Sequence, residues 1–138
     1  MSQYYDQVAS LSPSIWYKLN ETSGTPVNSG SLTQTLTVSG TPSLNQTGIQ
    51  DKCVYLNGSS SFAVSTNTAG LLSDNTYSIE FWFKSTATSG VIYSIYNSVA
   101  GSGVQVFLSA GKLNFNTHDI NNSGGNSLTT TATYNNGS

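Results

Sequence analysis

Charge is the scarcest property of this 138-residue sequence. Charged residues make up 7% of it, against about 25% in an average globular protein. The chain has four lysines, no arginine and six acidic residues, and its formal net charge is −2. Nucleic acids and anionic membranes are bound through clusters of Lys and Arg, so the composition argues against both as partners.

Long apolar runs and paired cysteines are also missing. No run approaches the roughly 18 residues that indicate a membrane span. Residues 1–6 lack the cationic start and apolar stretch of a secretory signal. The single cysteine, Cys53, cannot form an internal disulfide, and we expect it to be a small buried hydrophobic residue.

Ser, Thr, Asn, Gln and Gly take the place of the missing charge, and aromatic residues make up 11% of the chain. A disordered segment of this polarity would have more charge and fewer aromatic residues. Aromatic and β-branched side chains fit the pleated, half-buried surface of a sheet. The composition therefore predicts a folded, all-β protein.

The alternation of apolar and polar residues predicts where the strands lie. Strands are expected at 14–19, 31–39, 52–56, 61–65, 76–84, 91–96, 104–108, 113–117 and 128–134. The strongest is 76–84, 91–96 has the composition of a central strand, and 40–50 is expected to be a loop. The dipeptides Asn57-Gly58 and Ala110-Gly111 predict hairpins between the strands that flank them.

This spacing of short strands predicts an antiparallel two-sheet sandwich or jelly roll over residues 13–138. Residues 1–12 are expected to form an N-terminal arm or short helix, which Pro13 ends. The expected core consists of Tyr17, Leu19, Tyr55, Phe62, Ile79, Phe81, Phe83, Val106, Leu108 and Phe115.

The titratable residues do not form a pattern that predicts catalysis. A glycosidase needs two carboxyl groups beside one bond, and Glu80 is the only carboxylate in its predicted strand. His118 is the only histidine, and the adjacent Asp119 would point to the opposite face of a strand, where it could not orient the imidazole. We therefore expect no enzymatic activity.

Calcium is the one metal for which the sequence offers ligands. The oxygen-bearing candidates in predicted loops are Asn20, Glu21, Asn28, Asp51 and Asn57. Only Glu21 and Asp51 are carboxylates, and affinity for Ca²⁺ falls with the number of charged ligands. The sequence therefore predicts no cofactor, and at most a weak calcium site at these two residues.

Trp16 and Trp82 are candidates for ligand binding, because an exposed indole ring can stack on a sugar ring. Both lie on the strand face opposite the main apolar row. The alternative is that a second layer of the fold buries them, and the high average burial of Trp favours this alternative.

Four segments resemble concanavalin A-like, laminin-G-like domains. They are Trp16 to Gly24, Asn28 to Gly30, Val54 to Gly58 and Tyr77 to Lys84. The Tyr-rich residues 4–20 are similar to the versions found in bacteriophage tail and other virion proteins. The resemblance implies a jelly-roll module for carbohydrate or protein adhesion, without catalysis. Two positions that are often aspartate in the family are Asn28 and Asn57 here, which weakens an inherited calcium site.

The resemblance leads us to expect a structural protein of a phage virion, at the tail or capsid surface, assembled in the host cytoplasm and exposed after lysis. Expected partners are other virion proteins, copies of the same chain and a host surface glycan. The alternative is a carbohydrate-binding module of a bacterial surface or secreted protein. Turn-forming residues at 135–138 are followed by no strand, so we expect the sequence to be the N-terminal part of a longer domain, or a partner to supply the missing strands.

Overall fold

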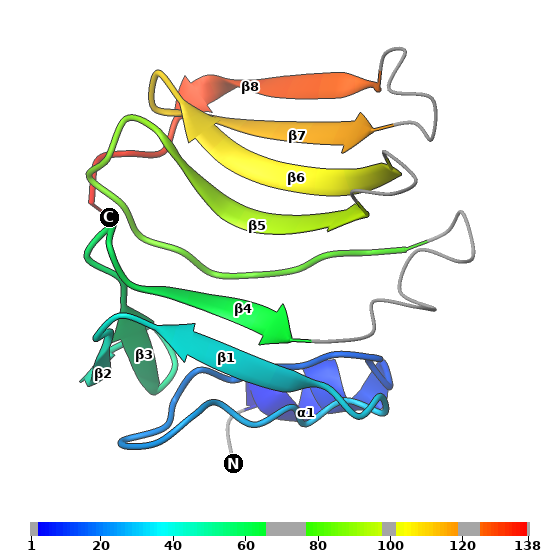
Figure 1. Ribbon diagram of the computed structural model, residues 1–138, viewed down its shortest axis with the longest axis vertical. Coiled ribbons are helices and arrows are strands. Elements are labelled where there is room, and N and C mark those ends of the chain that lie inside the picture. Colours follow the sequence, from blue (N-terminus) through cyan, green and yellow to red (C-terminus); the bar gives the residue numbers. More distant parts are fainter. Residues whose placement is uncertain (1–2, 66–76, 98–101, 119–124, 138) are drawn as a thin grey trace. The chain divides into compact units, whose positions relative to one another are not determined.

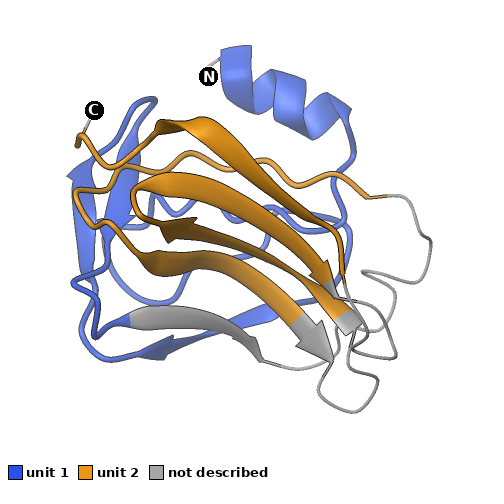
Figure 2. Ribbon diagram, turned by 90° about the horizontal axis from the view of Figure 1, so that it is seen from above, with its two compact units in different colours: residues 1–71 blue, residues 72–138 orange. Residues whose placement is uncertain are grey.

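The computed structural model describes residues 3–65, 77–97, 102–118 and 125–137 (Figure 1). The chain divides into two compact units, Met1–Leu71 and Leu72–Ser138 (Figure 2). The described residues form one short helix and eight strands, and every strand pairing is antiparallel. The predictions of an all-β chain and of a short N-terminal helix are confirmed.

The helix α1 spans Gln3–Ser10. The side chains of Tyr4, Tyr5 and Val8 are half-buried, as their helical spacing predicts, whereas the fourth apolar residue of the stripe, Leu11, is exposed. Two residues after the helix, Ser12 has a positive φ of 51°, in the left-handed conformation common after a helix, and Pro13 follows.

Two small sheets make up the strands of the first unit. In one, β1 (Thr35–Ser39) pairs with β4 (Ser61–Ser65); in the other, β2 (Ser43–Thr47) pairs with β3 (Lys52–Tyr55). The strands beside Asn57-Gly58 exist, but they pair in different sheets, so the hairpin predicted there is wrong. The predicted loop 40–50 contains β2, and Asn45, with a φ of 58°, lies where the register between β2 and β3 shifts.

Residues 14–19 do not form the predicted first strand. Tyr17 makes an isolated bridge with Asn28, and Leu19 has a φ of 56°, which interrupts the extended backbone. Residues 13–16 are nevertheless paired with residues 28–32 through the backbone. Trp16 O accepts from Ser29 N at 2.8 Å and Ser14 O accepts from Leu32 N at 3.0 Å.

The second unit contains a four-stranded sheet in the order β5-β6-β7-β8. The strands are β5 (Gly90–Asn97), β6 (Ser102–Ser109), β7 (Lys112–His118) and β8 (Ser127–Thr133). The predicted hairpin at Ala110-Gly111 is confirmed: Ser109 pairs with Lys112, and the two turn residues have φ values of 49° and 76°. Positive φ at both positions is typical of a type I′ turn. The predicted central strand, β5, lies at one end of the described sheet.

Residues 77–87 lie in no described strand, although 76–84 was the strongest strand prediction; Thr76 itself lies outside the described residues. The predicted alternation is present all the same. Ile79, Phe81 and Phe83 are half-buried, with the last two rings 5.8 Å apart, while Glu80 and Lys84 are exposed. These side chains therefore lie on the predicted faces, although the structure assigns no strand to residues 77–87.

Among the described residues, the most buried apolar side chains are on β6. Val104, Val106 and Leu108 are at most 4% exposed, and Leu36 of β1 is also buried. Val106 and Leu108 confirm part of the predicted core. Tyr55 is 59% exposed, so its assignment to the core is wrong. Tyr17, Leu19, Ile79, Phe81, Phe83 and Phe115 are half-buried, and the Phe62 side chain lies outside the described part of the structure.

Candidate functional site

Trp16 lies in a cluster with the helix rather than on an open surface. The Tyr5 ring meets it edge-on at a centroid distance of 6.0 Å. The Lys18 ammonium lies 4.7 Å from the Trp16 ring centroid and 5.5 Å from that of Tyr5. An ammonium at this distance is attracted by the ring face. The half-buried Trp16 therefore packs α1 against the segment that follows it. Its ring already contacts Tyr5 and Lys18.

Trp82 differs from Trp16, because its side chain is 64% exposed. The expectation that a second layer buries it is wrong. The reason is the alternation along residues 77–87: Phe81 and Phe83 face inward, so Trp82 shares the outward side with Glu80 and Lys84, which are also exposed. Of the two candidate sugar platforms, Trp82 is the one with most of its surface in water.

The two carboxylates proposed as calcium ligands each have a structural contact. Glu21 Oε1 accepts a hydrogen bond from Val27 N at 3.0 Å, and Asp51 Oδ2 accepts one from Asn20 Nδ2 at 3.0 Å. Glu21 Oε2 is buried and has no hydrogen-bond partner among the described residues. Within that part of the chain, no group of three His, Cys, Asp or Glu side chains could hold a metal ion.

Asp51 also belongs to the surroundings of the helix. Burial raises the pKa of Tyr5, the negative charge of Asp51 raises it further, and a hydrogen bond with the Asn20 side chain lowers it. Tyr5, Asn20 and Asp51 thus form a polar chain beside the Trp16 cluster. This arrangement gives Asp51 a role in holding α1 in place.

Asn28 and Asn57, the other loop candidates, use their side-chain oxygens to bind backbone N–H groups. Asn28 Oδ1 accepts from Trp16 N at 2.8 Å and from Gly30 N at 2.9 Å, while its Nδ2 donates to Leu32 O. Asn57 Oδ1 accepts from Ser59 N and Ser60 N, both at 2.9 Å. Both amides organise turns. Their oxygens are therefore already used, and Glu21 and Asp51 remain as the candidate calcium ligands.

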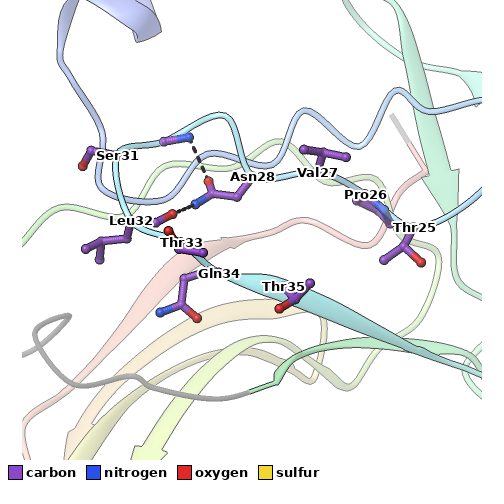
Figure 3. Close-up of a pocket in the computed structure, with 10 residues that line it drawn as sticks. Thr25, Pro26, Val27, Asn28, Ser31, Leu32, Thr33, Gln34 and Thr35 are labelled. Carbon is purple, nitrogen blue, oxygen red and sulfur yellow. Dashed lines mark hydrogen bonds between the residues drawn. The ribbon is translucent and has the colours of Figure 1, made fainter.

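A shallow hollow of about 390 Å³ lies in the first unit, on the chain between Thr25 and Thr35 (Figure 3). Its lining residues carry no charge; they are Thr25, Pro26, Val27, Asn28, Gly30, Ser31, Leu32, Thr33, Gln34 and Thr35. The bridge between Val27 and Thr35 closes this loop, and the Asn28 amide crosses it to Leu32 O. The sequence did not predict the hollow. Its residues were expected to form a turn and an exposed strand, and neither pattern indicates that Val27 pairs with Thr35.

Cys53, His118 and Glu80 are the remaining reactive groups singled out from the sequence. Cys53 is half-buried rather than buried, and its thiol donates weakly to Thr47 O at 3.4 Å. His118 ends β7, but its side chain, like Asp119, lies outside the described residues. Glu80 is exposed. In the described portion of the chain, no helix has the length and hydrophobicity required to cross a membrane.

Comparisons with known proteins add no identification. No family model matches the chain, and neither a curated protein nor a solved structure matches it. The resemblance to laminin-G-like domains therefore rests on the sequence motifs.

Proposed function

We propose that this protein is a structural component of a phage virion surface that recognises carbohydrate through a laminin-G-like jelly roll. The observation that carries the proposal is the exposed Trp82. Trp82 is 64% exposed, and its indole ring offers an apolar face on which a sugar ring can stack. Its outward neighbours at two-residue spacing are Glu80 and Lys84. A carboxylate can accept hydrogen bonds from sugar hydroxyls, and an ammonium can donate to them.

The sparse charge of the chain supports an uncharged ligand. Only ten of 138 residues are formally charged at neutral pH, four basic and six acidic. The hollow between Thr25 and Thr35 has the same character, since hydroxyl and amide groups line it together with Val27 and Leu32. Neutral polyhydroxylated ligands match such surfaces better than phosphates or cations do.

Binding to an array of bacterial surface polysaccharides tests the recognition part of the proposal. Trp82→Ala should weaken binding about tenfold, which corresponds to about 1.4 kcal/mol. Tyr55→Ala removes another exposed aromatic ring, 59% exposed in the first unit, and should leave binding unchanged. Equal binding by the wild type and by Trp82→Ala, with both folded by circular dichroism, would contradict a role for Trp82.

Mass spectrometry of purified virions tests the location. The proposal requires the protein to be present in the particle, and its absence there would favour the second candidate, a carbohydrate-binding module of a bacterial surface or secreted protein. The exposed Trp82 fits both candidates and does not distinguish them. The neighbouring genes do. Tail and capsid genes support the first candidate, and genes for glycan use support the second.

A further inference from the structure

The sequence contains the tripeptide Asn-Gly-Ser twice, at Asn57 to Ser59 and at Asn136 to Ser138. Asn-Gly is the dipeptide in which the backbone nitrogen of the second residue most readily attacks the side-chain amide of the first, because glycine has no side chain to obstruct the approach. The tripeptides are the same, so a comparison with the unfolded chain separates the effect of the structure at each site from that of the flanking residues.

At the first site the backbone nitrogen is accessible. Gly58 is exposed, has a φ of 82°, and has no atom within 4 Å of the position a Cβ would take. Its N–H has no hydrogen-bond partner among the described residues. No hydrogen bond of the Gly58 N–H to the described residues has to break before this nitrogen can react.

The Asn57 amide is held by two donors at the atom where charge develops during such an attack. Ser59 N and Ser60 N each donate to Asn57 Oδ1 at 2.9 Å. When a nucleophile adds to Cγ, negative charge accumulates on this oxygen. Two fixed N–H groups directed at such an oxygen stabilise the charged state more than the neutral amide.

The second site is restrained. Gly137 N donates to Ser85 O at 3.0 Å, so its proton is engaged by a carbonyl. That hydrogen bond has to break before the nitrogen can lose its proton and attack. A backbone hydrogen bond worth about 1 kcal/mol corresponds to about a fivefold lower rate.

We propose that Asn57 is a site of spontaneous deamidation in the folded protein and that Asn136 is protected. The Gly58 nitrogen forms a bond to Asn57 Cγ and loses its proton to solvent. The bond from Cγ to Nδ2 breaks, and Nδ2 leaves as ammonia after taking up a proton. Water then opens the cyclic imide at either carbonyl and gives aspartate or isoaspartate; no oxidation or reduction takes place.

The product changes the connection between two sheets. Residues 56–60 join β3 to β4, which belong to different sheets. Isoaspartate adds a methylene group to the backbone here, and both products add a negative charge to a chain whose formal net charge is −2. Isoaspartate therefore misaligns the Ser59 and Ser60 N–H groups, whereas aspartate retains both acceptor contacts.

Timed incubation of the purified chain at mildly alkaline pH, followed by proteolysis and mass spectrometry, tests the proposal. Each site is followed by the mass change of NH₂ to OH in its own peptide, in the native protein and in urea. The rate at Asn57 divided by the rate at Asn136 should be at least about fivefold higher in the native protein than in urea. Normalising to the unfolded chain removes any effect of the residues that flank each tripeptide.

Two further measurements make the outcome decisive. Asn57→Gln should abolish the mass change in the first peptide and leave the second unchanged, and labelling by an isoaspartyl methyltransferase should fall in the same variant. A native ratio no higher than the ratio in urea would overturn the proposal. So would a native rate at Asn57 below its rate in urea together with a faster reaction at Asn136.

Discussion

The side-chain amide of Asn28 joins three parts of the chain at once. It accepts from Trp16 N and Gly30 N and donates to Leu32 O. An aspartate at this position could accept the first two hydrogen bonds, but it has no N–H to donate, and it would place a negative charge against a carbonyl oxygen. Asn28 is therefore required as an amide.

Asn28→Asp should lower the free energy of unfolding by about 1 kcal/mol, because it loses the hydrogen bond to Leu32 O and places a carboxylate against that carbonyl. Urea denaturation followed by tryptophan fluorescence measures the change. Asn57→Asp is the matched control, because the Asn57 side chain is engaged only through its oxygen, and it should change stability by less than about 0.5 kcal/mol. Equal losses in the two variants would show that the donated hydrogen bond to Leu32 O contributes nothing.

Two tyrosines provide a second matched pair. The Tyr17 hydroxyl is buried and has no hydrogen-bond partner among the described residues, whereas the Tyr5 hydroxyl bonds with the Asn20 side chain. Tyr17→Phe removes an unsatisfied polar atom and should leave stability unchanged or raise it by up to about 1 kcal/mol. Tyr5→Phe should lower stability by about 1 kcal/mol in the same denaturation experiment. A large loss on Tyr17→Phe would reveal a partner for its hydroxyl.

The same pair predicts the response to alkaline pH. Burial raises the pKa of both phenols above 10.0, so the folded state retains its phenolic protons at pH values where the unfolded chain loses them. Their contribution to stability is complete below pH 10.0 and declines as the pH rises through the folded-state pKa. The decline should be smaller in Tyr17→Phe than in the wild type.

Among the elements, the two predicted hairpins show which information the sequence contains. At Ala110-Gly111 the turn and the strands agree, and the hairpin forms. At Asn57-Gly58 the turn chemistry is also satisfied, with Gly58 at a φ of 82° and the Asn57 oxygen capped, but β3 and β4 pair with β2 and β1 instead. Local chemistry predicts that the chain turns; it does not predict the partner, which depends on contacts between residues far apart in the sequence.

The pairing of residues 13–16 with 28–32 depends on a close approach at Gly30. A Cβ on Gly30 would lie 2.5 Å from Ser14 O, which is a backbone atom, so the two segments would have to separate. Gly30→Ala should cost about 1–3 kcal/mol, as overpacking generally does.

Gly24→Ala is the control for the Gly30 prediction. Gly24 has a φ of 79° and open space around it, so only the backbone conformation is penalised, at about 1 kcal/mol. Thermal unfolding of both variants compares the two costs. A smaller loss for Gly30→Ala than for Gly24→Ala would mean that the segments are less tightly paired than the structure shows.

For the candidate site, the alternation in the predicted strand 76–84 correctly placed Ile79, Phe81 and Phe83 on the inward face, but it did not predict that Trp82 on the other face is exposed. Trp16 and Trp82 occupy equivalent positions in their patterns. One is engaged by Tyr5 and Lys18, and the other is 64% exposed. The burial of a side chain depends on which other segments pack against it. The two-residue alternation of apolar and polar residues does not contain that information.

For the whole molecule, the free edge of β8 predicts how copies of the chain associate. Among the described elements, β8 packs only against β7, and it lies at the end of the sheet. It contains no charged residue and no proline, the features that usually deter edge pairing, and Leu128 is 69% exposed. The register between β7 and β8 shifts between Lys112 and Asn114, so the regular stretch of β8 is only Ser127 to Thr129. A short regular edge predicts weak, concentration-dependent association.

Leu128→Lys should therefore shift the chain toward the monomer, because two copies paired at this edge would bring the added ammonium groups close together. Sedimentation velocity over a range of protein concentrations measures the shift. Ile49→Lys adds the same charge at a side chain that is 70% exposed in the first unit, and it should leave the association unchanged. A wild-type chain that stays monomeric at every concentration would show that the shifted register is sufficient to protect the edge, since bulged strands twist away from new partners. Equal effects of the two lysines would instead assign the association to net charge, because each variant alters the total charge by the same amount.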